Sequence, residues 1–405
     1  MEKNSYYNIL LKREWSYTTG AVIMAVLAVM LATFAGNWGV AGALGFWGGK
    51  FLMLIGINAD SWAMYNGSLA RYNFLTNQPS ITNVALILGA AISSLLAAQW
   101  KIRGIRSVQQ VSAAVIGGLL MGIGARIAPS CSIGALFSAI PAMSLSGWIF
   151  LVFVFLGATV GGKIVTKWFM PPVSYTPKNN RKKLSSEERR RNRIIQIVIG
   201  SVLIVVGLIF AFLTRETAPA AGFILFIGMG LGYAIQRSRF CFTAAYRDPT
   251  MIGSTKMTKA LIIALAVATL GFAGIHLSRY GVDLSRLPEV VPGNPIGLHL
   301  VIGSFIFGIG AVLAGGCGCG VFIRVGEGCV QGAIALIFFI AGNIMSAPFM
   351  TNVVQQSPFL YSGRRIYLPE LLGGFGPAIL LQLLVLLLLW IAADRWEKRK
   401  KPAAI

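Results

Sequence analysis

The chain has little charge and almost no histidine. Only 12% of its 405 residues are Asp, Glu, Lys or Arg, and it contains two histidines. It has no P-loop, no G-x-S-x-G and no Rossmann fingerprint in a plausible context, so the common nucleotide-binding and hydrolase motifs are missing. Five cysteines in apolar or glycine-rich surroundings do not make a disulfide framework. We therefore expect no enzymatic activity and no cofactor.

The chain contains several long apolar segments without a charged residue. They are Ala21–Gly36, Ile194–Phe212, Ala260–Ile275 and Phe375–Ala393, in a chain that is 56% apolar. A bilayer core of about 30 Å needs about 20 apolar residues in a helix. Only helices or closed barrels satisfy their backbone in lipid. The sequence therefore predicts an all-α, polytopic helical membrane protein.

The net charge of +22 is concentrated at the ends of the apolar segments. Eight basic residues lie between Lys178 and Arg193, five close the chain after Asp394, and three precede the first apolar run. The positive-inside rule places such clusters in the cytoplasm. This pattern predicts cytoplasmic N- and C-termini in a multi-pass protein and argues against nucleic-acid binding. No cleavable signal peptide is visible, so we expect the first run to be retained.

One glycine-rich stretch occurs twice. Residues Val115–Gly134 read VIGGLLMGIGARIAPSCSIG, and residues Val301–Gly320 read VIGSFIFGIGAVLAGGCGCG. A shift of 186 (301 − 115) aligns them without a gap, with ten of the twenty positions identical, including Cys131 with Cys317. The repeat predicts two membrane halves, residues 1–169 and 194–394, joined by a basic cytoplasmic linker, 170–193, and followed by a basic tail, 395–405. Since each half begins and ends beside basic residues, we expect the halves to have the same orientation.

Each copy ends in a break. Pro129 and Ser130 precede Cys131 and Gly134 follows it, while Gly315 and Gly316 precede Cys317 and Gly320 follows it. Helix breaks at membrane depth are tolerated where they line a cavity, and freed backbone N–H groups can face an anion. Broken helices at matching places in two halves point to a transport site. The plainer alternative is a small buried apolar cysteine.

Four other sites carry weaker signals. Cys241 lies in the polar turn Gln236–Asp248 beside Arg239, and cationic neighbours lower a thiol pKa and attract anions. Arg126 aligns with an uncharged residue, Val312, in the second copy. A charge at membrane depth is expected to be functional, and the alternative is a structural arginine that donates a hydrogen bond to a backbone carbonyl. Cys319 forms a C-x-C pair with Cys317, a poor zinc or copper signature without histidines, so we predict no metal. Arg324 and Glu327 are predicted to pair with each other.

At these residues the sequence resembles the YeeE/YedE family of sulfur-transport domain proteins. The motifs that carry the resemblance are GARIAPSCSIGALFSAI around Cys131, RSRFCFTAAYRD around Cys241 and LAGGCGCGVFIRVGEG around Cys317. The order of motifs is most similar to the YedE branch, which is linked to selenium metabolism. The resemblance implies a bacterial inner-membrane importer of a small sulfur- or selenium-containing anion, with Cys131, Cys241 and Cys317 lining the path. The supporting residues are Arg126, Arg239, Gly134, Gly315, Gly316, Gly320 and Cys319.

Family association also implies a small cytosolic TusA-like sulfur-carrier as partner, with the basic linker as its dock. Two alternatives to anion transport remain open from the residues. The first is a membrane thiol oxidoreductase or a sulfur or selenium transferase, in which cysteine pairs exchange disulfide or persulfide. The second is a soft-metal permease for Cu(I).

Overall fold

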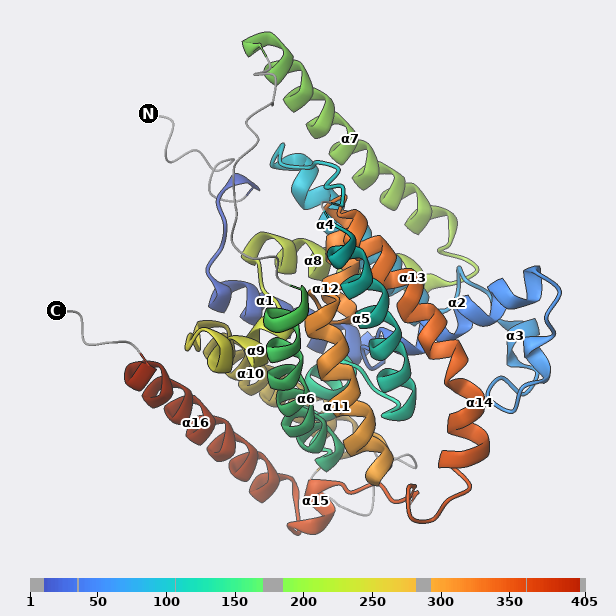
Figure 1. The fold of residues 1–405 in the computed structure, drawn as a ribbon, viewed down its shortest axis with the longest axis vertical. Coiled ribbons are helices and arrows are strands. Elements are labelled where there is room, and N and C mark those ends of the chain that lie inside the picture. Colours follow the sequence, from blue (N-terminus) through green and yellow to red (C-terminus); the bar gives the residue numbers. More distant parts are fainter. Residues whose placement is uncertain are drawn as a thin grey trace.

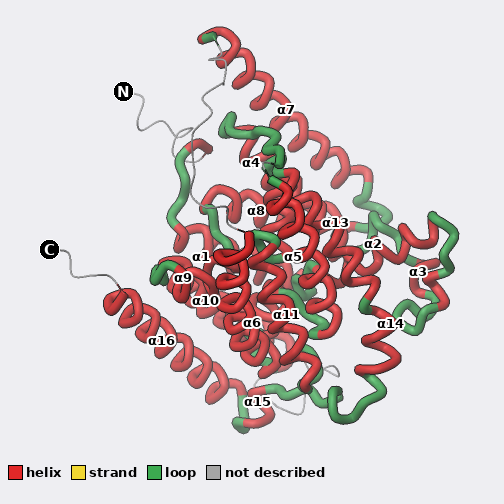
Figure 2. Tube along the Cα trace, viewed as in Figure 1, coloured by secondary structure: helices red, strands yellow, loops and turns green. Residues whose placement is uncertain are grey.

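The computed structural model describes residues 11–34, 36–105, 107–169, 185–281, 293–361 and 363–400. Within these ranges the chain is helical and has no strand (Figure 2). Ten helical segments are long and apolar enough to cross a membrane, which confirms a polytopic all-α membrane protein. The residues outside these ranges include Lys178 and most of the predicted linker.

Figure 1 labels the helices in their order along the chain. Those of the first part are α1 Tyr17–Phe34, α2 Ala41–Leu54, η2 Ala59–Ser61, α3 Ser68–Arg71, α4 Gln78–Leu96, α5 Val108–Ile127, η3 Gly134–Ala139, α6 Leu145–Ile164 and η4 Val165–Phe169. Those of the second part are α7 Ser186–Leu213, α8 Pro219–Ser238, α9 Phe242–Met251, α10 Lys256–Tyr280, α11 Leu298–Leu313, α12 Gly318–Gly326, α13 Val330–Met345, α14 Ala347–Phe349, η6 Met350–Val354, α15 Leu368–Leu371 and α16 Phe375–Lys400.

The two glycine-rich helices, α5 and α11, pack against each other in opposite directions. A Cβ added at Gly117 would lie 2.3 Å from the backbone nitrogen of Ala314, and one at Gly124 would lie 2.5 Å from that of Phe307. Early residues of α5 thus meet late residues of α11. Small residues allow this close approach, as in other membrane helix pairs.

Helices α1 and α8 are antiparallel as well. The backbone nitrogen of Trp15, just before α1, donates to the carbonyl of Arg237 near the end of α8 over 3.1 Å. At the other end, the rings of Phe34 and Phe223 lie 4.8 Å apart. The prediction that corresponding segments share one orientation is therefore wrong. Helix α7 adds one crossing between the two glycine-rich segments and reverses the direction of the helices after it.

Four helices are interrupted within the bundle. The breaks separate α1 from α2, α5 from η3, α8 from α9, and α11 from α12. Cys241 is the N-cap residue of α9 and Cys317 that of α12. The predicted polar turn Gln236–Asp248 is wrong, since α8 continues to Ser238 and α9 begins at Phe242. Because the breaks fall in the interior, their free backbone groups lie within protein rather than in lipid.

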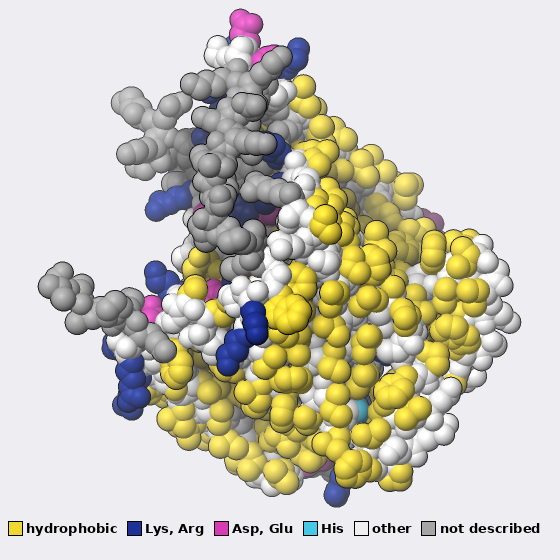
Figure 3. Space-filling model, viewed as in Figure 1, with side chains coloured by type: hydrophobic (Ala, Val, Ile, Leu, Met, Phe, Trp, Pro, Cys, Tyr) yellow, Lys and Arg dark blue, Asp and Glu magenta, His cyan; other side chains and the backbone are white. Residues whose placement is uncertain are grey.

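Two long helices lie at the periphery of the bundle (Figure 1). Helix α7 begins at Ser186, inside the predicted linker, because Ser185 and Glu188 form a reciprocal capping box. Most of its apolar side chains are exposed, as are those of α16. Apolar side chains also cover most of the face seen in Figure 3, while Lys and Arg gather mainly toward its upper and left edges. Such a surface suits contact with lipid tails.

Candidate functional site

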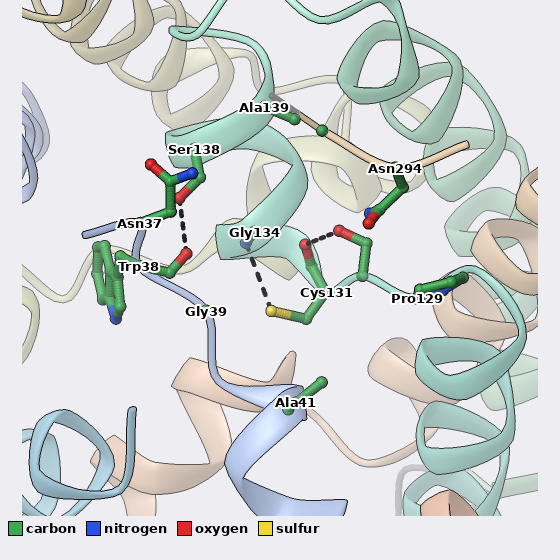
Figure 4. A pocket seen from close by; sticks show the side chains of 13 residues that line it. Asn37, Trp38, Gly39, Ala41, Pro129, Cys131, Gly134, Ser138, Ala139 and Asn294 are labelled. Carbon is green, nitrogen blue, oxygen red and sulfur yellow. Dashed lines mark hydrogen bonds between the residues drawn. The ribbon is translucent and has the colours of Figure 1, made fainter. Parts of the chain in front are cut away.

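A pocket of about 240 Å³ surrounds the first motif cysteine. It lies where the α1–α2 break, the α5–η3 break and Asn294 meet (Figure 4). Cys131 is 3% exposed, and its Sγ accepts a weak hydrogen bond from the backbone nitrogen of Gly134 over 3.4 Å. Ser138 Oγ donates to the carbonyl of Trp38 over 2.7 Å and ties η3 to the α1–α2 break. We call this cavity the Cys131 pocket.

A second pocket, of about 380 Å³, contains Cys241. It lies between the end of α8, the α11–α12 break and α12, and Arg103 contributes from the segment before α5. The predicted residues Arg239, Gly315, Gly316 and Gly320 all line this cavity. We call it the Cys241 pocket.

The third motif cysteine is buried between them. Cys317 is 1% exposed and has both Cys241 and Cys131 as neighbours. The hydroxyl of Ser132 lies beside this thiol and 2.6 Å from the hydroxyl of Tyr246. Ser132 follows Cys131 of the first pocket and Cys317 follows Gly316 of the second, so this buried cluster adjoins both pockets. We call Ser132, Tyr246, Cys317 and Cys319 the septum. Cys319 is 2% exposed and belongs to it.

Glu327 holds the charged rim of the Cys241 pocket together. Its carboxylate is only 6% exposed and accepts from Arg103 Nη1 at 3.2 Å and Arg239 Nη1 at 2.7 Å. Gln236 Nε2 donates to the same carboxylate over 3.0 Å. Glu14, just before α1, also bonds Arg239 Nε at 3.2 Å. The predicted pair between Arg324 and Glu327 is wrong, because Glu327 binds arginines from two other segments.

Gly315 is needed for both its conformation and its size. Its φ is +78°, in the left-handed region that favours glycine. A Cβ there would lie 2.6 Å from Nη1 of Arg324. The glycine therefore leaves the space that the Arg324 guanidinium occupies in the Cys241 pocket.

Arg126 lies outside both pockets. Its Nε is buried and has no hydrogen-bond partner in the described part of the chain. Its charge acts on Tyr65, whose hydroxyl donates to the carbonyl of Gly45 over 2.6 Å. Burial raises the pKa of Tyr65 to about 12, and the positive charge of Arg126 opposes part of that shift. The structure thus separates Arg126 from the cysteines with which the sequence grouped it.

Several functional candidates were not predicted from the sequence. Ser132 and Tyr246 complete the septum, while Trp38, Ser138 and Asn294 line the Cys131 pocket. Ser132 and Ser138 fall inside the first motif, but nothing in the sequence indicates which neighbour each one contacts. Among the described residues, no group of three or more His, Cys, Asp and Glu side chains could hold a metal ion.

Comparison with known proteins places the chain in a family. The model of the family described as "Sulphur transport" matches residues 1–160 and 237–404. The chain belongs to this sulphur-transport family. The matched residues include the Cys131 pocket, all three motif cysteines, the septum and every lining residue of the Cys241 pocket except Ile235 and Gln236, so nearly all of the candidate site lies within the family's shared region.

Curated members of the sulphur-transport family support the assignment along the whole chain. The "Probable transporter YedE" of Escherichia coli K12 is 31% identical over 401 residues, which cover 96% of this chain and 95% of the relative. The "Thiosulfate transporter TsuA" of the same organism is 32% identical over 184 residues, 44% of this chain and 49% of the relative. A TsuA from Spirochaeta thermophila is 37% identical over 116 residues, 28% of this chain and 33% of the relative. These relatives are named as transporters, in agreement with the expectation of a transporter rather than an enzyme.

Proposed function

We propose that this protein imports a small sulfur-containing anion of the thiosulfate class along a path past Cys131, Cys317 and Cys241. The observation that carries the proposal is the placement of the three thiols. One lies in each of two separate pockets, and the third is buried in the septum between them. Two relatives that match part of the chain are named thiosulfate transporters, which supports this substrate class.

We assign the Cys241 pocket to the cytoplasmic side. Lys101 and Arg103 precede α5 at this end of the bundle, and Gln196 of α7 accepts from the backbone nitrogen of Trp100 over 3.2 Å. The first turns of α7, with Arg189 to Arg193, therefore lie at the same end. Basic residues concentrate on the cytoplasmic side of membrane proteins. On this assignment the Cys131 pocket opens outward in a bacterial inner membrane, and both chain termini are cytoplasmic.

The thiols suit the passage of a thiosulfate-like anion. A thiol is a weak donor and a polarizable partner for a terminal sulfur or selenium atom. Backbone N–H groups freed at the breaks before α9 and α12 add donors without adding a fixed charge. A transport site must bind strongly enough to admit its substrate and weakly enough to release it. Three thiols in sequence meet this condition, and no covalent step is needed.

Passage requires the septum to open. The hydroxyls of Ser132 and Tyr246 bond each other, and the buried thiol of Cys317 lies beside Ser132. When an anion enters from the Cys131 pocket, the septum groups would break these bonds and donate hydrogen bonds to the anion instead. Opening would therefore leave few buried polar groups unpaired, and its free-energy cost would be low. The septum would thus act as a selectivity barrier.

We further propose that a selenium-containing anion competes for the same path, and that a TusA-like carrier receives sulfur at the cytoplasmic end. The resemblance of the motifs to the selenium-linked branch supports the first proposal. The basic residues at the Cys241 end, which suit an acidic protein face, support the second.

Uptake of radiolabelled thiosulfate in cells that lack their own sulfate and thiosulfate importers tests the proposal. The wild type is compared with Cys131→Ala, Cys241→Ala and Cys317→Ala at matched membrane expression, and unlabelled selenite serves as competitor. Ser201→Ala is the control, because Ser201 is exposed on α7 and lines neither pocket. We expect uptake to be lost in the motif variants and kept in the control. Uptake that survives all three motif substitutions would contradict the proposed path.

A further inference from the structure

The two pockets are lined by equivalent positions of the two motifs. When the two copies of the repeat are aligned with the shift of 186 positions, four residues that line the Cys131 pocket align with four residues that line the Cys241 pocket. The pairs are Pro129 with Gly315, Ser130 with Gly316, Gly134 with Gly320, and Ser138 with Arg324. Three of these pairs consist of small or uncharged residues. The fourth places a cation in one pocket where the other has a hydroxyl.

The side chains of this fourth pair differ in their bonding. Ser138 Oγ is occupied by its hydrogen bond to the carbonyl of Trp38. Arg324 lines the Cys241 pocket half-buried, and its side chain makes no hydrogen bond or ion pair within the residues that the structure describes. The Arg324 side chain lies against two glycines: its Cβ is next to Gly332 and its guanidinium is next to Gly315. Because these residues have no side chain, they leave room for Arg324 and do not neutralise its charge.

The other arginines of the Cys241 pocket are neutralised. Arg103 and Arg239 both bind the carboxylate of Glu327, and Arg239 binds Glu14 as well. Arg324 is the remaining arginine of the lining and contacts no carboxylate in the described part of the chain. A partly desolvated guanidinium presents several N–H donors in a planar fork that fits two oxygens of an oxyanion.

We infer that Arg324 binds the charged oxygen end of the transported anion in the Cys241 pocket and sets a preference for doubly charged oxyanions there. The inference rests on the proposed function. In this arrangement the oxygens face Arg324 while the soft terminal atom faces the thiol of Cys241, so charge and softness are recognised at opposite ends of one small pocket. The Cys131 pocket has no such cation among its lining residues. Anion affinity therefore differs between the two ends of the path.

Anion binding to the purified full-length protein in lipid nanodiscs tests this role. Equilibrium binding of labelled thiosulfate and labelled sulfate is measured for the wild type, Arg324→Gln, Arg324→Lys and the control Arg215→Gln, because Arg215 follows α7 and lines neither pocket. Uptake kinetics and melting temperature are measured for the same proteins. We expect Arg324→Gln to weaken binding of both anions and to raise KM by about tenfold to a hundredfold, the loss of a charge-assisted contact. Arg324→Lys should restore part of the binding, because it keeps the charge and loses the fork.

The outcomes separate this inference from the proposed function. Wild-type affinity in Arg324→Gln would overturn the inference, even if Cys317→Ala abolished transport. So would a drop in melting temperature in Arg324→Gln with no recovery of binding in Arg324→Lys, which would show a structural role. If the wild type transported no thiosulfate but bound the anions through Arg324, the inference would stand and the proposed function would fall.

Discussion

The hydroxyls of Ser132 and Tyr246 lie 2.6 Å apart in the buried layer between the two cysteine pockets. Ser132 follows Cys131 directly in the α5–η3 break, and Tyr246 lies on α9, one turn after Cys241. The same serine lies beside the thiol of Cys317. The short hydrogen bond thus joins the first two cysteine motifs next to the third, so its removal tests whether the septum takes part in transport.

Tyr246→Phe should slow anion transport without unfolding the protein. The substitution keeps the ring, which is fully buried, and removes one hydroxyl. Loss of one buried hydrogen bond costs about 0.5–1.5 kcal/mol of stability. We expect a several-fold lower maximal uptake rate, because the passing anion loses a donor, and a melting temperature only a few degrees lower. An uptake rate equal to that of the wild type would remove Tyr246 from the path.

Gly117→Ala should destabilise the central helix pair. A Cβ at this position would lie 2.3 Å from the backbone nitrogen of Ala314, so α5 and α11 would have to move apart. Overpacking of this kind costs about 1–3 kcal/mol. Thermal unfolding in detergent measures the effect. The matched control is Gly274→Ala on α10, where nothing lies within 4 Å of an added Cβ. Equal melting temperatures for the two variants would contradict the close packing of α5 and α11.

Glu327→Gln should weaken the fold and tighten anion binding. It removes the carboxylate that holds Arg103 and Arg239, so Arg103 loses its carboxylate partner beside the Cys241 pocket and Arg239 keeps only Glu14. Breaking a buried pair is strongly destabilising, but here both arginines are partly exposed and screened, so we expect a loss of about 1–3 kcal/mol. Binding of labelled thiosulfate should become tighter and release slower. Weaker binding in a folded Glu327→Gln protein would show that Glu327 positions the arginines for the anion instead.

The sequence predicted the membrane class and the helix breaks well, for local reasons. Long uncharged runs can only be spans, and Pro129 or Gly315 ends a helix wherever the chain folds. Relative orientation is different, because it depends on counting every crossing. The half-helices α2 and α9, with 14 and 10 residues, are too short to be counted from hydropathy. The extra crossing of α7 then reversed the expected orientation.

The ion-pair partners of charged side chains could not be predicted from the sequence either. Glu327 was expected to pair with Arg324, three residues away, yet it binds Arg103 and Arg239, which are 224 and 88 positions away. On a helix the side chains at positions 324 and 327 can meet. Here Glu327 is the C-cap residue of α12 and turns toward α8, while Arg324 stays over Gly315. Only the packing of α8 against α12 decides between these pairings.

The measurement that tests the central claim most directly is uptake of labelled thiosulfate into proteoliposomes that contain only this purified protein. Wild type and Cys317→Ala are compared at equal reconstitution, with empty liposomes as baseline. Intact mass before and after uptake shows whether any cysteine carries an adduct. We predict uptake by the wild type, baseline values for Cys317→Ala and unmodified thiols throughout. Equal uptake by both proteins, or a persulfide on a motif cysteine during turnover, would contradict non-covalent transport along the three thiols.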